Sequence, residues 1–408
     1  MSHHLVLFDD STYLRLLPLT FTRPVSALRT GILTIAEKWA WYFAQPPVIF
    51  AAEHLRAKFP VPIFEQTESA VFVNASMLPS PTLCRQIEVL KTGQAIIDEK
   101  RAIVIAFCPP DPNNIDAQLL LSETFAAQIS QKYAIQLPPA ESGYEQINHW
   151  WHLFERNGQA LWHDFGLLTA NRQSIPLSAN NRVTCPENIF VEEGASIEHA
   201  LLNAQNAPIY VGKHAEIMEG VMVRGGLSLG EHATLKMGAK VYGATTIGPH
   251  CKIGGEIGNS VILGYSNKGH DGYLGNSVLG EWCNLGADTN NSNLKNNYST
   301  VSVWSYEQQK QIDTQLQFCG MVMGDHSKTA INTMLNTGTV VGVCTNIFGA
   351  GFPPKHIPSF TWGMGNAPYE FDKAIETAER VYERRKQTLT PADREVLRRV
   401  WALNGGTQ

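Results

Sequence analysis

The segment Lys268-Gly269-His270-Asp271-Gly272-Tyr273 combines side chains that can carry out proton transfer. Imidazole has an ordinary pKa close to neutrality, which makes His270 a candidate general base. The glycines beside it allow a ligand to approach the backbone, and Tyr273 adds a phenol three residues further on. Mere exposure is the simpler explanation for most histidines of this chain, but the glycine-flanked context favours a catalytic role for His270.

A strict six-residue repeat precedes this segment and must position it. Aliphatic residues occupy every sixth place in one stretch: Val211, Ile217, Val223, Leu229, Leu235, Val241, Ile247 and Ile253. In a helix, six residues turn the side chain by roughly 240° and scatter these positions over three faces. In a strand, six is a multiple of the two-residue period, so all of them point to one side. The repeat predicts a parallel β-helix over about residues 186–351, and an antiparallel sandwich is the weaker alternative.

The six-residue phase is lost at residues 263–276, the stretch that contains His270. We therefore predict that the β-helix is interrupted there. A segment that breaks a regular solenoid is where function is often found. Downstream, residues 290–295 form a polar loop with one positive charge at Lys295, suited to sugar hydroxyls and phosphate.

The composition argues against several classes of function. The chain has 408 residues, a net charge of −5 and a pI near 6.2, so it has no overall bias toward nucleic acid. Its seven cysteines are dispersed, odd in number and without a CxxC motif, which favours a reducing compartment over a disulfide framework or a zinc site. Residues 5–8 are too short for a signal peptide, and no apolar run approaches a membrane span. We expect a soluble cytoplasmic protein.

Four parts are predicted along the chain: an α/β domain (1–165), a linker (166–185), the β-helix (186–363) and a helical cap (364–408). The α/β domain is indicated by strand-like runs that alternate with helical patterns, at 5–8, 48–52, 70–73 and 103–107. One helix is predicted over 26–44, and another begins after Ser80. Helical patterns at 368–386 and 391–401 are expected to close the open end of the β-helix.

Motifs along almost the whole chain resemble one known family, at residues 7–10, 16–24, 28–39, 151–160, 164–169, 353–355 and 360–363. They are similar to those of a sugar nucleotidyltransferase family common in Bacteroidetes. That family is similar to the bifunctional uridyltransferase/acetyltransferase that makes UDP-N-acetylglucosamine. The resemblance implies a nucleotidyltransferase-like, Rossmann-like α/β domain followed by a left-handed parallel β-helix.

The resemblance also implies roles for individual residues. Residues 269–275 are similar to the Gly-His-x-x-Tyr-x-Gly segment of the glucosamine-1-phosphate acetyltransferase domain, in which the His is the base for the attacking amine. It assigns that role to His270, contact with the sugar phosphate to Tyr273, contact with the sugar to Asn284 and the lining of acetyl-CoA to Ala287. Further substrate contacts are expected from Lys240, Lys268 and Lys295, and further acyl-CoA contacts from Ser327, Lys328 and Lys355.

Some positions depart from the pattern of the relatives. Near Lys240, where relatives use an Arg and a Lys for the sugar phosphate, only Lys240 keeps a charge, so the acceptor can differ from glucosamine-1-phosphate. In the N-terminal domain, the first strand runs into Asp9 and Asp10 instead of a glycine-rich phosphate loop, and two carboxylates there need a Mg²⁺ ion beside a phosphate. Asn74 stands where relatives have a metal-binding Asp.

Three arginines can compensate for the missing phosphate loop. We interpret Arg15, Arg23 and Arg29, together with Asp9, as nucleotide-binding residues, because guanidinium groups suit phosphates. The alternative is that they are solvated or pair with Asp9 and Asp10.

The sequence thus predicts a homotrimeric acyltransferase that moves an acetyl group from acetyl-CoA to an aminosugar phosphate. Its N-terminal domain would be an active or degenerate nucleotidyltransferase that uses UTP and Mg²⁺. Two alternatives remain: a chain with nucleotidyl transfer as its one activity, and a non-catalytic sugar-nucleotide sensor or scaffold. We expect neither nucleic-acid nor membrane partners.

Overall fold

The computed structural model describes residues 3–65, 68–138, 144–365 and 367–405, and the chain divides into two compact units. The first unit consists of Met1–Leu16, Thr22–Leu28 and Leu33–His149. The second consists of Leu17–Phe21, Arg29–Ile32 and Trp150–Gln408. Two short segments near the N-terminus therefore belong to the second unit.

The first unit is built on a mixed six-stranded sheet in the order β2-β1-β3-β6-β5-β7. Its strands are β1 (His4–Phe8), β2 (Val48–Phe50), β3 (Ala70–Asn74), β5 (Gln94–Asp98), β6 (Ile103–Cys108) and β7 (Ala134–Gln136). A small ladder pairs β4 (Met77–Leu78) with β8 (Glu145–Gln146), and the longer helices are α1 (Ile35–Phe43), α2 (Pro81–Glu88), α3 (Ala117–Leu120) and α4 (Phe125–Lys132). The rings of Phe8, Phe72 and Phe107 pack together in its core. The predicted α/β fold is confirmed.

Helix α1 begins later than the sequence pattern predicts. It starts after Thr34, whose side chain and that of Glu37 form a reciprocal capping box. The prediction of a helix from residue 26 is wrong: a short 3₁₀ turn, Val25–Ala27, lies at that position and ends well before α1. The backbone N–H groups of Gly31 and Ile32 are instead bonded to side chains of a distant helix.

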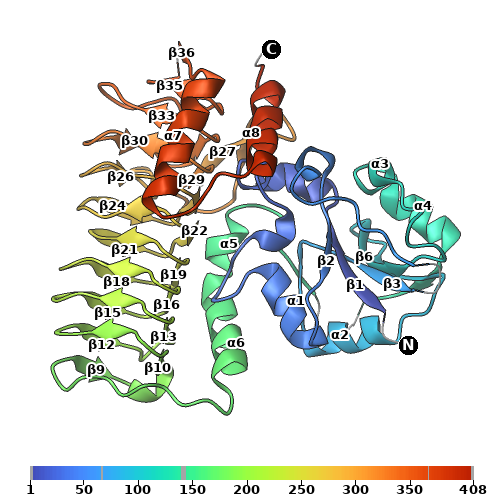
Figure 1. Ribbon diagram of the computed structural model, residues 1–408, viewed down its shortest axis with the longest axis horizontal. Helices are drawn as coiled ribbons and strands as arrows, with labels where there is room; N and C mark the ends of the chain where they lie inside the picture. The colour runs from blue at the N-terminus through green and yellow to red at the C-terminus, as the bar shows by residue number, and fades with distance from the viewer. Residues whose placement is uncertain (1–2, 66–67, 139–143, 366, 406–408) are drawn as a thin grey trace. The chain divides into compact units, whose positions relative to one another are not determined.

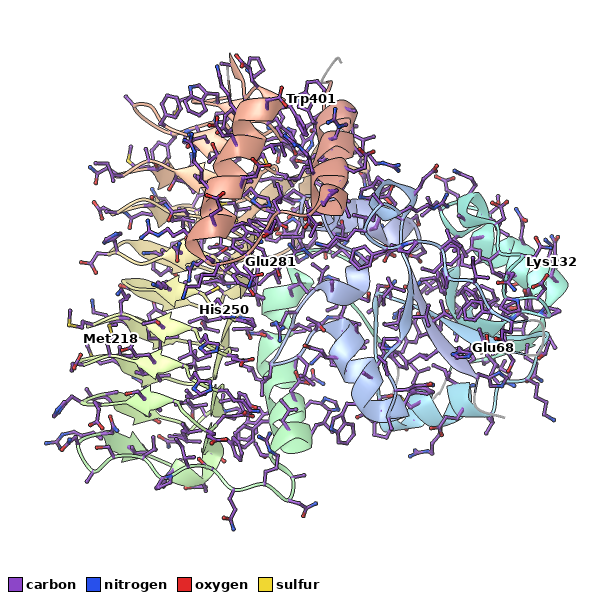
Figure 2. The ribbon with its side chains drawn as sticks, in the orientation of Figure 1. Glu68, Lys132, Met218, His250, Glu281 and Trp401 are labelled. Atoms are coloured by element: carbon purple, nitrogen blue, oxygen red, sulfur yellow. The ribbon has the colours of Figure 1, made fainter. Side chains whose placement is uncertain are left out.

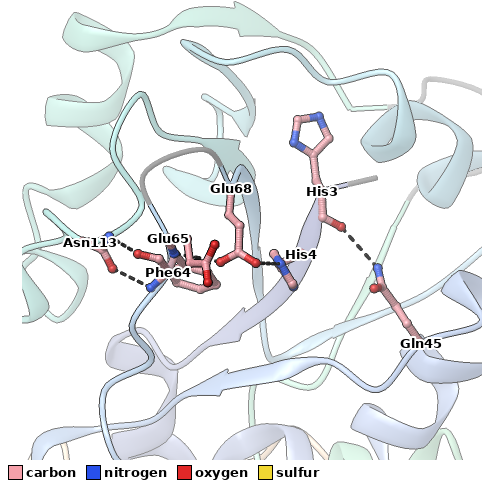
Figure 3. Close-up of polar contacts among 7 residues, drawn as sticks. All are labelled: His3, His4, Gln45, Phe64, Glu65, Glu68 and Asn113. Atoms are coloured by element: carbon pink, nitrogen blue, oxygen red, sulfur yellow. Dashed lines mark hydrogen bonds and ion pairs between the residues drawn. The ribbon is translucent and has the colours of Figure 1, made fainter. Parts of the chain in front are cut away.

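A loop beside the first strand is tied down by side-chain hydrogen bonds (Figure 3). The side chain of Asn113 accepts from the N–H of Phe64 and donates to its carbonyl, both at 2.8 Å. Glu68 accepts from the N–H of Glu65 and meets the imidazole of His4, at the start of β1, at 3.0 Å. Since the His4–Glu68 pair is largely exposed, we expect it to contribute little to stability.

The second unit is a left-handed parallel β-helix with three faces, as predicted (Figure 1). Face A contains β10 (Ile189–Val191), β13 (Ile209–Val211), β16 (Leu227–Leu229), β19 (Thr245–Ile247), β22 (Val261–Gly264), β25 (Val278–Glu281), β29 (Met321–Met323), β32 (Thr339–Val341) and β34 (His356–Ile357). Face B contains β11 (Ser196–Ile197), β14 (Glu216–Ile217), β17 (Thr234–Leu235), β20 (Lys252–Ile253), β23 (Asn267–Lys268), β30 (Lys328–Thr329), β33 (Asn346–Ile347) and β35 (Thr361–Trp362), followed by β36 (Ala367–Pro368). Face C contains β9 (Arg182–Thr184), β12 (Leu201–Asn203), β15 (Met222–Arg224), β18 (Lys240–Tyr242), β21 (Glu256–Gly258), β24 (Tyr273–Gly275), β26 (Asn290–Asn291) and β31 (Met334–Leu335).

The aliphatic residues of the repeat point into this β-helix in register. Val211 pairs with Leu229 and Leu229 with Ile247, while Val223 pairs with Val241 on another face. All of these side chains are at most 2% exposed. One coil is thus three hexapeptides, and each coil buries the aliphatics of its neighbours.

The predicted interruption at residues 263–276 is wrong. Strands β22, β23 and β24 continue the three faces through this stretch, and Ile247 pairs with Ile262, so the coil is merely shortened. The chain leaves the coils later, between β26 and β29, in an antiparallel hairpin of β27 (Ser302–Ser305) and β28 (Lys310–Asp313). A turn can be shorter by a few residues while the strands on either side still point the same side chains inward. The loss of the six-residue spacing therefore does not mean that the coils are interrupted.

Stacked aromatic rings line the corner between faces A and B. His214, His232, His250, Tyr265 and Trp282 follow one another with ring centroids 4.2–5.1 Å apart. Figure 2 labels His250 in this row and Met218 at a different corner. The row continues into the C-terminal region, whose helices are α7 (Phe371–Arg384) and α8 (Pro391–Leu403).

Helix α7 lies along the side of the β-helix. Tyr382, near its end, stacks on Trp282 at 3.9 Å, while Phe371, at its start, contacts Phe360 in the last coil. Arg385, just beyond α7, donates to the side chain of Asn267 on face B. Helix α7 and the residue after it therefore contact a side of the β-helix as well as its last coil.

Helix α6 (Asn157–Thr169), preceded by α5 (His152–Glu155), joins the β-helix to one of the N-terminal segments of its unit. The side chain of Asn157 accepts from the N–H of Gly31 (2.6 Å) and donates to the carbonyl of Ala244 (2.7 Å). Asp164 accepts from the N–H of Ile32 (2.8 Å). Asn157 and Asp164 are fully buried, so these bonds are shielded from water. We call this arrangement the α6 clamp.

Candidate functional site

His270 is exposed at the corner between faces B and C, in the turn that joins β23 to β24. Within the described residues, no hydrogen-bond partner is found for its imidazole, whereas its backbone carbonyl accepts from Lys268 Nζ (2.8 Å). The ring is therefore available to accept a proton from a ligand.

Lys268 is not exposed, although the sequence assigned it to substrate contact. It stands opposite Ile253 at an inward-facing position and is 1% exposed. Its ammonium donates to the carbonyls of Gly254 (3.3 Å) and His270 (2.8 Å), and burial lowers its pKa to about 8. The structure corrects the prediction: Lys268 supports the turn that carries His270 from inside the β-helix.

Raising the pH from about 7.5 to about 10 should stabilise the wild-type protein more than a Lys268→Met variant. The pKa of Lys268 is about 8 in the folded chain, against an ordinary value of 10.5. Between these values the unfolded chain binds the additional proton, so stability rises with pH. The full shift corresponds to about 3 kcal/mol. Urea unfolding at both pH values measures the difference, and an identical pH dependence of the two proteins would contradict the burial of this ammonium.

Ala287 lies at the same corner as His270, one coil further on. The two turns are stacked, since the N–H of Asp288 donates to the carbonyl of Asp271 (3.0 Å). Asn284 is exposed on face B and forms a parallel bridge with Asn267. The structure therefore brings three of the predicted residues, His270, Ala287 and Asn284, to neighbouring coils around one corner.

Tyr273 lies on the other side of this corner, on face C. Its hydroxyl accepts from Asn293 Nδ2 (2.9 Å), and burial raises its pKa. Lys240, Glu256 and Tyr273 follow one another in register on successive coils, and Glu256 accepts a hydrogen bond from Tyr242 (2.5 Å). Face C thus presents the Tyr273 hydroxyl, which remains protonated and can donate to a ligand.

The polar loop at 290–295 is used largely by the protein itself. Asn290 and Asn291 accept from the N–H groups of Tyr273 (2.7 Å) and Gly275 (3.0 Å), so their side chains satisfy the edge of β24. Lys295 donates to the carbonyl of Thr300 (2.5 Å). These intramolecular hydrogen bonds hold Tyr273 in place. They leave fewer polar groups of the loop available to bind a sugar than the sequence predicts.

Of the predicted acyl-CoA residues, Ser327 is not accessible, and Lys328 is only partly exposed. Ser327 is fully buried, with its hydroxyl bonded to the carbonyl of Gly342 (2.6 Å). Lys328 donates to the carbonyl of His326 (2.7 Å), and burial lowers its pKa. Lys355 remains partly exposed, and its pKa is lowered first by burial and then by the charge of Lys295. The burial of Ser327 corrects its assignment, whereas contact of Lys328 and Lys355 with acyl-CoA stays a prediction.

In the first unit, Asp9 is buried and its carboxylate is occupied. It accepts from the N–H groups of Val25 (3.0 Å) and Ala52 (3.1 Å), and burial raises its pKa to about 7. Asp10 accepts from Asn74 Nδ2 (2.7 Å). These carboxylates are used to order loops at the end of β1, so they do not fit a preformed Mg²⁺ site, and direct contact between Asp9 and a nucleotide is not supported. Among the described residues, no group of three or more His, Cys, Asp or Glu side chains is placed to hold a metal ion.

The three predicted nucleotide-binding arginines are divided between the two units. Arg15 donates to the side chain of Asn148, and Arg23 is 7% exposed. Arg29 belongs to the second unit and donates to the carbonyl of Ile32. Their role in binding nucleotide remains a prediction.

A groove of about 670 Å³ on face C was not predicted from the sequence. Its lining includes Met222, Arg224, Gly225, Lys240, Tyr242 and Glu256. Arg224 stands opposite Tyr242 in the neighbouring coil. The sequence holds a signal for this: Arg224 stands one regular coil of 18 residues before Tyr242, so the repeat itself places the two side by side.

Comparison with known proteins identifies the N-terminal part. Residues 5–173 match the family described as "Sugar nucleotidyl transferase". The resemblance recognised from the sequence is therefore supported, and this match extends to the end of helix α6.

Two further similarities are more limited. Over 87 residues the chain is 32% identical to "Bifunctional protein GlmU" of Methanocaldococcus jannaschii, which is 21% of this chain and 21% of that protein. A crystal structure of the polysialic acid O-acetyltransferase OatWY matches 46% of this chain and 83% of that one, with 12% identity and a TM-score of 0.19. That score is too low to support a structural argument. The chain spans about a fifth of the length of the GlmU protein that it matches.

No helix among the described residues is long and apolar enough to cross a membrane. All seven cysteines are free thiols in the structure.

Proposed function

We propose that this protein is an acetyl-CoA-dependent N-acyltransferase that acts on an aminosugar carrying phosphate. The observation that supports this proposal best is the position of His270. It is exposed at a corner beside Ala287, with Tyr273 on one adjoining face and Asn284 on the other. Free cysteines are consistent with a cytoplasmic location, where acetyl-CoA is available.

These residues suit amide formation. The amine of the sugar attacks the thioester carbonyl, the C–N bond forms and the C–S bond breaks, and CoA leaves as the thiol. His270 accepts the proton that the amine loses, since an ammonium cannot act as a nucleophile. Tyr273 and Asn284 can hold sugar hydroxyls on either side, and the small side chain of Ala287 leaves room for the thioester.

We propose that the active form is a homotrimer. Exposed apolar side chains gather around the same corner and its adjoining faces: Ile331 (68%), Met334 (41%), Phe348 (37%) and Trp362 (40%). Such a group is typical of a surface that another molecule covers. A closed ring of three copies would bury it. A monomer mass in light scattering at micromolar concentrations would contradict the trimer.

Incubation with acetyl-CoA and a panel of amino-sugar phosphates tests the proposed activity. We expect free thiol to be released in proportion to N-acetylated product. Binding of these ligands without any thiol release would instead favour the scaffold alternative.

The N-terminal unit is proposed to be a divergent sugar-1-phosphate nucleotidyltransferase, on the strength of its family match. Incubation with UTP, Mg²⁺ and a hexose-1-phosphate, with pyrophosphate as the readout, tests this part separately. Loss of UTP binding in Arg15→Ala or Arg23→Ala would support their predicted role.

A further inference from the structure

The groove on face C is lined by two cations, Arg224 and Lys240, and by one carboxylate, Glu256. Arg224 on β15 and Lys240 on β18 are both exposed, and within the described residues neither forms an ion pair. The nearby carboxylate of Glu256 is bonded to the hydroxyl of Tyr242 (2.5 Å). Gly225 leaves the backbone bare beside the two cations. This combination suits phosphate groups, which prefer guanidinium and ammonium donors beside open backbone.

The groove is continuous with the candidate site. Lys240 and Glu256 stand in one register column with Tyr273, and the hydroxyl of Tyr273 interacts with that of Tyr242. Tyr273 in turn lies beside the corner that carries His270. A single ligand can therefore occupy the groove and reach the base.

The separation of the two ends determines what kind of ligand this is. Neighbouring strands are about 4.8 Å apart, so the two or three coil steps from the cations to Tyr273 amount to roughly 10–14 Å. In a hexosamine 1-phosphate, only a few covalent bonds separate nitrogen from phosphorus. In a nucleoside-diphosphate sugar the first phosphate is as close to the nitrogen as in the 1-phosphate, but the second phosphate and the nucleoside extend further. A groove of about 670 Å³ has the volume for them.

We propose that the acceptor is an amino sugar linked to a nucleoside diphosphate, with its phosphates bound by Arg224 and Lys240 and its amine at His270. This inference rests on the proposed acyltransferase function and narrows its substrate class.

Acetyl-transfer kinetics with UDP-glucosamine and with glucosamine-1-phosphate test the inference. We expect the wild-type protein to have the higher kcat/KM for UDP-glucosamine. Arg224→Gln and Lys240→Gln should each raise KM for UDP-glucosamine about tenfold, the effect of one charge-assisted hydrogen bond, with little change in kcat. Arg182→Gln is the matched control, since Arg182 is exposed on β9 of the same face but does not line the groove.

Wild-type KM values in both groove variants would overturn the inference, even if thiol release with glucosamine-1-phosphate confirmed the acyltransferase. If no acceptor is acetylated, calorimetry with UDP-glucosamine separates the two proposals. Weaker binding in Arg224→Gln but not in Arg182→Gln would support the groove while the proposed activity fails. Any binding by the N-terminal unit would remain the same in all three variants, and isotherms that are identical throughout would overturn the groove assignment.

Discussion

Replacing His270 by alanine should reduce acetyl transfer by about 10² to 10⁴ while leaving the fold intact, because removal of a general base has effects of this size. The side chain is exposed, and no aliphatic of the β-helix core depends on it. Thiol release from acetyl-CoA should fall close to background, whereas ligand binding should survive. Acidification should also lower the wild-type rate, since a protonated imidazole cannot accept the proton of the amine.

His199 provides the control for this experiment. It is exposed at the same corner of the β-helix, two residues after Ile197, as His270 is two residues after Lys268. His199→Ala should therefore retain the wild-type rate. If His270→Ala keeps more than about a tenth of the activity with every acceptor, the base lies elsewhere.

Replacing Gly31 by alanine should destabilise the second unit by about 2–5 kcal/mol. Gly31 has a φ of +76°, and an added Cβ would lie 2.5 Å from Asp164 Oδ2 and 2.8 Å from the backbone of Ala160. The substitution therefore combines a left-handed backbone with a collision against helix α6, and it weakens the α6 clamp. Urea unfolding followed by circular dichroism measures the loss.

Gly238→Ala separates the two causes. Gly238 has a similar φ of +70°, but an added Cβ meets nothing within 4 Å. We expect it to cost about 1–2 kcal/mol, the backbone contribution alone. Equal destabilisation by the two substitutions would mean that contact with α6 contributes nothing.

The β-helix could be predicted from the sequence because its rule is local. A residue points into the β-helix when it is correctly spaced from the next inward residue along the chain. The strand pairs, such as Val211 with Leu229 and Leu229 with Ile247, follow from that spacing. The start of α1 could not be predicted in this way. Its position depends on hydrogen bonds from Gly31 and Ile32 to side chains more than a hundred residues away. A periodic pattern in the local sequence cannot indicate such contacts.

The candidate site was only partly predictable for a related reason. His270 stood out because glycines surround it, and the structure places it at an exposed corner. Lys268 looked equally suitable in the sequence. It occupies an inward-facing position because the coil before it is shorter than 18 residues, and the strict six-residue spacing does not show this. Arg224 was overlooked because it lies one coil before Lys240 and Tyr242 and belongs to no recognised motif.

The division of the chain has a consequence for its synthesis. Since Leu17–Phe21 and Arg29–Ile32 belong to the second unit, the polypeptide passes between the two units five times. The N-terminal segments leave the ribosome long before the coils that they bind have been made. We expect them to wait, unfolded or chaperone-bound, until helix α6 and the coil of Thr246 emerge, so that neither half can be excised at a single cleavage point without removing part of the other.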